Sequence, residues 1–255
     1  MRGSSQTSGL VTAILSAAGF VAVWAAAAAL IGQPQRLPSP AVVAAVMADE
    51  AASGRLWLHL GATLARVAAA FVLALSIGAA LGLALGRMPR LDRWLNAWVV
   101  IFLNLPALVV IVLCYIWLGL NEVAAVLAVA INKIPMVTVM LREGARALSP
   151  ALDDMARAFR MSPGARLRHV VIPQLAPHLA SAARAGLALI WKIVLVVEFL
   201  GRSNGVGFQI HLAFSMFRVA EVLAYALAFV AVMLAVEYAV LRPIEARANR
   251  WRHDP

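Results

Sequence analysis

The chain has 255 residues, of which 63% are hydrophobic and 13% are charged, and its mean hydropathy is +0.87. A soluble domain carries about 25% charged residues, so this composition excludes an ordinary soluble protein and predicts an all-α integral membrane protein. The formal net charge of +10 comes almost wholly from arginine, with lysine only at Lys133 and Lys192. Most arginines lie between apolar runs, so we interpret them as membrane-flanking charges and expect no nucleic-acid partner.

Cysteine and histidine are too few and too scattered to indicate a disulfide or a metal site. The single cysteine, Cys114, lies inside an apolar run. The five histidines are His59, His169, His178, His211 and His253. No two of them stand at ligand spacing on one predicted helix, so we expect neither a metal nor a cofactor.

Six apolar runs are long enough to cross the roughly 30 Å hydrocarbon core of a bilayer as helices. They cover residues 10–31, 63–86, 97–118, 121–141, 178–200 and 219–241. The first run lacks a clear signal-peptidase site before the polar stretch that follows it, so we expect a retained helix. No composition shift or internal repeat divides the chain, which predicts a single transmembrane domain over residues 1–255.

Arginine in the loops predicts how these spans are oriented. Thirteen of the 22 basic residues fall in alternate loops and at the C-terminus: Arg87, Arg90, Arg93, Arg142, Arg146, Arg157, Arg160, Arg166, Arg168, Arg242, Arg247, Arg250 and Arg252. The loops on the other side hold Arg36, Arg55, Arg202 and Arg218. The positive-inside rule therefore predicts that both chain termini lie in the cytoplasm.

Two features flank and fill the second span. Residues 41–52 follow a proline-rich stretch and are mildly amphipathic, which predicts a short helix outside the membrane. Within the span, Gly78, Gly82 and Gly86 recur every four residues, a spacing that lets helix backbones approach closely. Packing within the chain and contact with a second copy both explain that series.

Residues 149–177 form a charged, proline-punctuated segment between the fourth and fifth spans. Ser149-Pro150 and Ser162-Pro163 each fit an N-cap followed by proline at the first helical position. They predict two short helices joined by a bend at 161–162. Because the residue before a proline disfavours helical geometry, we expect Pro173 to end the second helix.

The first of these short helices is predicted to be amphipathic. Leu152, Met155, Ala156 and Phe159 form one apolar stripe. Asp153 and Asp154 lie near the positive end of the helix dipole, and Arg157 and Arg160 lie off the stripe. Such a helix could lie on the membrane surface, but its two acids and short apolar face favour docking in a protein groove.

The spacing of this segment resembles the EAA signature of ABC-transporter permeases. That signature runs Glu-Ala-Ala, three residues, Gly, nine residues, Ile-x-Leu-Pro; here it is matched by Asp154-Met155-Ala156, Arg160 and Val170-x-Ile172-Pro173. In the family this loop is the coupling helix, which fits a cleft on a cytoplasmic ATPase subunit. The resemblance implies that the coupling residues here are Asp153, Asp154, Met155, Ala156, Arg157, Phe159, Arg160, Gly164 and Pro173. Arg160 departs from the pattern, since the usual glycine is small and accepts positive φ. Either the bend is built elsewhere, for instance at Gly164, or Arg160 contacts an acidic site on a matched ATPase.

Three further blocks resemble the nitrate/sulfonate/taurine branch of binding-protein-dependent importers: residues 36–40, residues 59–87, and Glu198-Phe199-Leu200-Gly201 followed by Gly205-Val206-Gly207. The resemblance covers about residues 36–250. It implies a pair of permeases in a bacterial inner membrane, a homodimer here, that carries a small solute. We expect an anion like a sulfonate, taurine or nitrate, although the branch also carries some neutral or cationic heterocycles. Its partners would be an ATPase dimer and a periplasmic or lipid-anchored solute-binding protein. The chain has no phosphate-binding G-x-x-x-x-G-K-[ST] loop, so we expect ATP hydrolysis on the separate subunit.

Lys133, Lys192 and Glu198 are charged residues inside the fourth and fifth predicted spans, where each costs at least about 2.5 kcal/mol if it faces lipid. Lys133 and Lys192 fall near mid-depth and Glu198 near the outer end. Lys192 and Glu198 are separated by about 240° around one helix, which excludes a pair between them. These charges either pair with other helices or line a path for an anion. Asn104, Asn132 and Trp191 could line that path with them, or simply pack.

Two other function classes fit the sequence less well. A polytopic membrane enzyme would need a catalytic motif such as G-x-S-x-G or H-E-x-x-H, and the sequence contains neither. A secondary transporter driven without ATP would favour inverted repeats and broken helices around a midplane site, which the sequence does not indicate. We therefore expect a transport subunit that is not itself an enzyme.

Overall fold

The computed structural model describes residues 3–243, and every regular element in that range is helical. The elements are α1 (Gly3–Ile31), α2 (Pro40–Ala52), α3 (Arg55–Arg87), α4 (Pro89–Asn104), α5 (Ala107–Leu118), α6 (Glu122–Arg146), α7 (Pro150–Ala158), α8 (Pro163–Arg166), the π-helical η1 (Leu167–Val171), α9 (Ile172–Gly201), α10 (Val206–Ser215), α11 (Val219–Val236) and the π-helical η2 (Glu237–Leu241). The all-α prediction is confirmed for these residues. The predicted cytoplasmic Arg247, Arg250 and Arg252 lie outside them.

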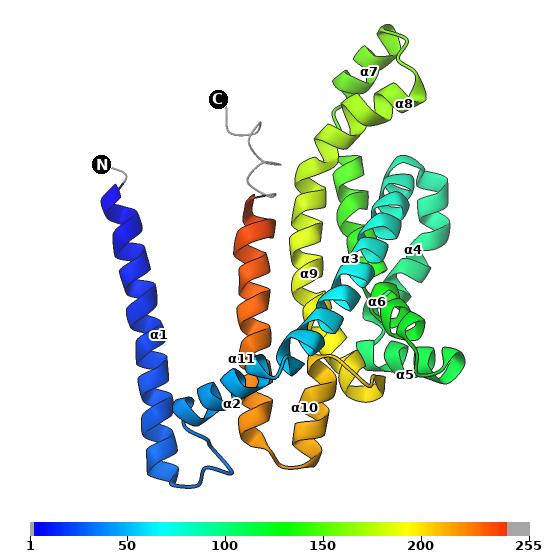
Figure 1. Ribbon diagram of the computed structural model, residues 1–255. Helices are drawn as coiled ribbons and strands as arrows, with labels where there is room; N and C mark the ends of the chain where they lie inside the picture. The colour runs from blue at the N-terminus through cyan, green and yellow to red at the C-terminus, as the bar shows by residue number, and fades with distance from the viewer. Residues whose placement is uncertain (1–2, 244–255) are drawn as a thin grey trace.

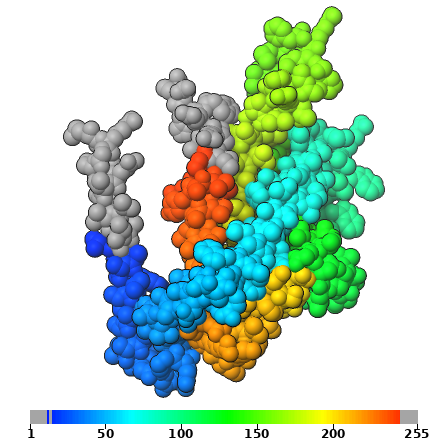
Figure 2. Space-filling view, in the orientation of Figure 1, coloured from blue at the N-terminus to red at the C-terminus, as the bar shows by residue number. Residues whose placement is uncertain are grey.

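Helices α3, α6 and α9 pack against one another and form the body of the molecule, with α11 beside them (Figure 1). Helices α7 and α8 project from one end of the molecule (Figure 2). Helix α2 is held on α11 because the Tyr225 hydroxyl donates to Glu50 Oε2 at 2.6 Å. Helix α1 stands apart from the body and is tied to the following loop by Trp24 Nε1, which donates to the Pro38 carbonyl at 3.0 Å.

The glycine series of the second predicted span lies in α3 and packs on α6. A Cβ atom at Gly82 would lie 2.6 Å from the Thr138 carbonyl oxygen, and one at Gly86 would lie 2.5 Å from Ala145 Cβ. Gly78 also packs closely, against Val137 and Ile134 of α6. Of the two explanations for this series, the structure therefore supports packing within the chain.

The third predicted span, 97–118, is not one helix. It is the pair α4 and α5, which meet at an angle of 96°. Pro106 has no N–H to continue α4, and its ring pushes Leu105 into extended geometry, with φ −67° and ψ 127°. Hydropathy averaged over the run could not detect this break, because both sides of it are apolar.

Three helices among the described residues are long and apolar enough to cross a membrane, namely Arg55–Arg87, Glu122–Arg146 and Val219–Leu241. The bent pair α4–α5 would make a fourth if it forms one span. A polytopic chain is thus supported, while the number of six spans stays a prediction. The short helix expected at 41–52 is confirmed as α2, whose N-cap Ser39 accepts from the Val42 N–H at 3.4 Å.

The prediction that Pro173 ends a helix is wrong. The chain runs from α8 through η1 directly into α9, and Pro173 lies in the first turn of α9. The Ile172 N–H bonds to the Leu167 carbonyl in the wider π-helical turn, and this widening leaves room for a proline ring that would clash in a continuous α-helix. Helix α10, which follows a glycine-rich turn, was not predicted.

Candidate functional site

The 149–177 segment forms the short helix α7 and, after a turn at 159–162, the start of a second helix at α8, where the Ser-Pro pairs predicted helix starts. The second helix is not short, because α8 continues through η1 into α9. Ser149 stands at the N-cap of α7, but its side chain makes no capping bond. Its N–H instead donates to Gln174 Oε1 at 2.9 Å, which ties the start of α7 to α9. Ser162 caps α8 in the expected way, because its Oγ accepts from the Ala165 N–H at 3.3 Å.

Asp153 fixes the segment to the rest of the chain. Its Oδ2 lies 2.9 Å from Arg87 Nη2 at the end of α3 and 2.7 Å from Arg166 Nη2. The hydrogen bond from Arg166, aided by the charge of Arg87, lowers the pKa of this carboxyl. The sequence placed Asp153 among the residues that contact an ATPase, whereas the structure directs it inward as an anchor.

Asp154 and the apolar stripe have a different environment. Asp154 is exposed, and its one ion-pair partner within residues 3–243 is Arg157, at 3.6 Å. Ala156 is 1% exposed and packs inward, whereas Phe159 is 78% exposed. Within the apolar stripe, Ala156 therefore packs α7 against the rest of the chain, whereas the other side chains face outward.

Leu152 and Met155 are partly exposed and line a cavity of about 240 Å³ beneath α7. The rest of its lining is His169, Val170, Pro173 and Gln174. Outward-facing apolar side chains and an adjacent hollow form a surface suited to docking a protein.

The turn after α7 is built at Arg160, whose φ is +49°. The Arg160 N–H bonds to the Arg157 carbonyl at 2.9 Å and the Met161 N–H to the Ala156 carbonyl at 3.0 Å. This pair of bonds is the Schellman motif that ends helices at a left-handed residue. Gly164 lies within α8 and has open space around it, so the bend is not built there.

Glu198, one of the candidate path residues, lies in the core with 0% of its surface exposed. Its Oε1 is 2.6 Å from Arg66 Nη1 of α3. Its Oε2 accepts from Thr63 Oγ1 and from the Gly207 N–H, each at 2.9 Å. The structure thus pairs Glu198 with another helix and, as predicted, not with Lys192.

Arg66 is the residue that the sequence reasoning missed. Its Nε and Nη2 each lie 2.7 Å from a Glu122 oxygen, and its Nη1 donates to the Asn204 carbonyl at 3.0 Å. Arg202 Nη2 reaches the same Glu122 at 2.6 Å. Arg66 interrupts an apolar run just as the lysines do, so the cost of a charge in a span could have identified it.

We call this group the polar cluster: Thr63, Arg66, Glu122, Glu198, Arg202 and Asn204. It explains the Glu198–Gly207 block. Gly205 has φ +108°, and a Cβ there would overlap the Glu198 carboxylate. A Cβ at Gly201 would lie 2.5 Å from the Tyr115 ring. Glycine is therefore required where the turn after α9 folds over this carboxylate.

The remaining candidate path residues are not gathered at one place. Lys192 is exposed on α9, and its ammonium makes no hydrogen bond or ion pair within residues 3–243. Lys133 is half-buried on α6 and likewise has no such bond there.

Both asparagines bond to carbonyls of α4 or its end, and Trp191 turns away from Lys192. Asn132 donates to the Leu105 carbonyl at 3.4 Å and Asn104 to the Val100 carbonyl at 2.8 Å. Trp191 is buried edge-on against Phe229, with ring centroids 5.5 Å apart.

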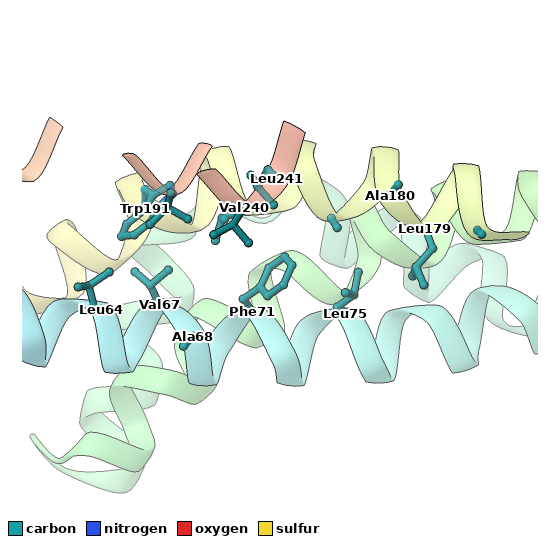
Figure 3. A pocket seen from close by; sticks show the side chains of 14 residues that line it. Leu64, Val67, Ala68, Phe71, Leu75, Leu179, Ala180, Trp191, Val240 and Leu241 are labelled. Atoms are coloured by element: carbon teal, nitrogen blue, oxygen red, sulfur yellow. The ribbon is translucent and has the colours of Figure 1, made fainter. Parts of the chain in front are cut away.

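Trp191 also lines a groove of about 620 Å³ between α3, α9 and α11 (Figure 3). Phe71 and Leu75 of α3 face it from one side and Leu241 from the other (Figure 3). Every side chain in its lining is apolar apart from the indole nitrogen. This groove does not suit a charged solute, because nothing in its lining would replace the hydration of an anion.

Residues 74–242 match the family described as the binding-protein-dependent transport system inner membrane component. The chain belongs to this family. It is therefore a transport permease subunit, a multi-pass protein of the inner membrane, and not an enzyme. Membership also implies an ATPase and a solute-binding protein as partners.

Curated relatives and a solved structure agree with this assignment. The putative aliphatic sulfonates transport permease protein SsuC of Bacillus subtilis (strain 168) is 26% identical over 96% of this chain and 89% of its own. The protein of that name from Escherichia coli (strain K12) is 30% identical over 74% of this chain and 73% of its own. The inward-facing MetNI methionine ABC transporter shares the fold, with a TM-score of 0.60 at 18% identity over 74% of this chain and 94% of that one. The predicted importer branch is confirmed.

Proposed function

We propose that this permease forms, with a second copy of itself, the membrane path of an ATP-driven importer for a small organic anion of the alkyl sulfonate or taurine class. The names of the two relatives support the sulfonate class. A homodimer is the simplest assembly, since one chain supplies one ATPase-docking segment and a symmetric importer needs two.

The observation that carries this proposal is the exposure of Lys192. It lies in α9 near the middle of the predicted span 178–200, and a lysine facing lipid at that depth costs at least about 2.5 kcal/mol. On the same face, Ser181, Ala188 and Val196 are also exposed. A second protomer and a water-filled path would cover this face, and the ammonium group would then attract an anion.

The proposed topology has six spans, with α4–α5 as one of them and both termini in the cytoplasm. Three observations support it. Both described ends of the chain lie at the end of the molecule that carries α7 and α8 (Figure 1). The ends of α3 and α6 that carry Arg87 and Arg146 lie there too, as does the end of η2, which Arg242 follows. Arg55, Arg202 and Arg218 begin or follow helices at the opposite end, in keeping with the positive-inside rule.

We further propose that α7 docks on the ATPase. The exposed stripe and its hollow support this role, and the polarity of the helix suits a protein groove. Asp154→Ala combined with Arg160→Glu should weaken co-purification of the ATPase. Unchanged co-purification would mean that the 149–177 segment is not the main contact.

The transport path is tested by uptake of labelled taurine and alkyl sulfonates into proteoliposomes that hold the whole transporter and its binding protein. Lys192→Ala should reduce uptake while leaving assembly intact, and Lys192→Arg should retain most of it. Normal uptake by Lys192→Ala would refute the anion path. Thermal stabilisation of the binding protein by sulfonates, nitrate and uncharged heterocycles would identify the solute class independently.

A further inference from the structure

The turn after α7 holds a side chain in a conformation that glycine would adopt without strain. Within residues 3–243, only Arg160 (φ +49°) and Phe217 (φ +57°) have positive φ among non-glycine residues. In this region the Cβ atom lies too close to the backbone carbonyl, so residues with a side chain are disfavoured. A strained residue at a surface turn is a reason to ask what its side chain does.

The two strained residues occupy the same place in the same motif. The Phe217 N–H bonds to the Phe214 carbonyl at 3.1 Å, and the Arg218 N–H to the Ala213 carbonyl at 2.8 Å. Arg160 makes the equivalent pair of bonds after α7. Glycine is the usual residue at this position. The turn itself therefore does not explain why arginine stands at 160.

The rest of the segment gives Arg160 nothing to bind. Its side chain is exposed, and its guanidinium makes no hydrogen bond or ion pair within the described part of the chain. Of the two acids of the segment, Asp153 is paired with Arg166 and Asp154 lies 3.6 Å from Arg157, and neither pairs with Arg160. The cation is thus free to meet a group outside the protomer.

Its neighbour indicates which way the turn faces. Phe159 precedes Arg160 and is 78% exposed, in the turn between α7 and α8, which project from the body (Figure 2). An exposed aromatic ring beside an unpaired guanidinium has the composition of an interface anchor, because aromatic residues and arginine dominate binding energy at protein contacts.

We infer that Arg160 is a docking residue that binds a carboxylate on the ATPase subunit, beside the site that receives Phe159. This inference rests on the proposed docking role of α7. A guanidinium selects a carboxylate because its planar donors match the two oxygens. The strain at 160 is then retained because glycine, although it suits the turn better, would lose this contact.

The test relies on two expected effects of opposite sign: replacing Arg160 by glycine should raise the stability of the permease and lower its affinity for the ATPase. In Arg160→Gly permease, reconstituted in nanodiscs of zwitterionic lipid, relief of the strained φ should raise the unfolding temperature by about 2–3 °C. Affinity for the ATPase should fall by roughly fivefold, as for loss of a charged interface contact. Arg160→Asn, which tolerates positive φ but has no charge, should show the same loss of affinity. Added salt should weaken the wild type more than either variant.

Two variants serve as matched controls. Phe217→Gly relieves the same strain at the other end of the molecule, so it should raise the unfolding temperature without changing ATPase affinity. Arg168 is an exposed cation of the same segment in helical geometry, and it too makes no ion pair within the described residues. Arg168→Gln should change neither quantity.

The inference is overturned if Arg160→Gly becomes more stable and still binds the ATPase as tightly as the wild type. Phe159→Ala separates this outcome from failure of the docking role. If Phe159→Ala weakens binding and Arg160→Gly does not, α7 docks without using Arg160. If neither changes binding, both the docking role and the inference are wrong.

Discussion

The two ends of α9 use charge in opposite ways. At the end near Glu198, the polar cluster buries two charges and gives each several partners. At the other end, the 149–177 segment pairs one acid firmly and leaves Arg160 and Asp154 in the open. A buried charge that loses its partners is costly, so the residues of the polar cluster must keep their positions. The polar cluster is therefore a rigid frame. An exposed charge costs little, so the second can serve a partner.

The largest effect on stability is expected from removing one charged partner of the polar cluster. Glu198→Ala would leave Arg66 buried with one of its two carboxylates removed, and loss of one partner of a buried pair costs about 3–5 kcal/mol. We expect a large drop in the unfolding temperature and in the yield of monodisperse permease. Lys192→Ala, on the same helix, is the control and should leave both unchanged. Wild-type stability of Glu198→Ala would mean that the cluster is not structural.

A smaller loss is expected where α3 meets α6. Gly82→Ala would force a methyl group to within 2.6 Å of a backbone oxygen that cannot move aside, and overpacking of this kind costs about 1–3 kcal/mol. Thermal unfolding measures this loss. Gly164→Ala adds the same methyl group in open space and should cause no loss. Equal stability of the two variants would contradict close packing of α3 on α6.

The smallest effect is expected at Asp153, and it depends on pH. Because its pKa is lower in the folded protein than its ordinary value of 3.8, ionised Asp153 stabilises the 149–177 segment above that pH. The contribution disappears as pH falls through the lowered pKa. At pH 7, Asp153→Asn should speed hydrogen exchange in α7 and α8 by an amount equivalent to about 1 kcal/mol.

Asp154→Asn is the matched control for that measurement, because the carboxylate of Asp154, next to Asp153 in the chain, is exposed and weakly paired. It should leave exchange in α7 and α8 unchanged at pH 7. The difference between wild type and Asp153→Asn should also vanish in acid. Equal exchange rates for the two asparagine variants at pH 7 would show that Asp153 does not anchor the segment.

Local patterns were enough to predict most of the helices and the family. Hydropathy located the long helices, and the Ser-Pro caps located α7 and α8, because both signals depend on residues close together in the chain. The motif spacing around Arg160 and Pro173 was enough to indicate the permease family. Hydropathy did not indicate the break at Pro106, and Pro173 does not end a helix as predicted, because a proline's effect depends on the turn around it.

The sequence by itself determined the membrane class, the helical content, the family and which helix ends carry arginine. Only the tertiary structure decided which charges meet. Glu198 and Arg66 are 132 positions apart, and nothing local to either one indicates the other. It also decided that Asp153 anchors while Asp154 faces out, and that Arg160 carries the positive φ itself. The physical reason is that pairing and backbone strain depend on distant packing, whereas hydropathy and capping depend on near neighbours.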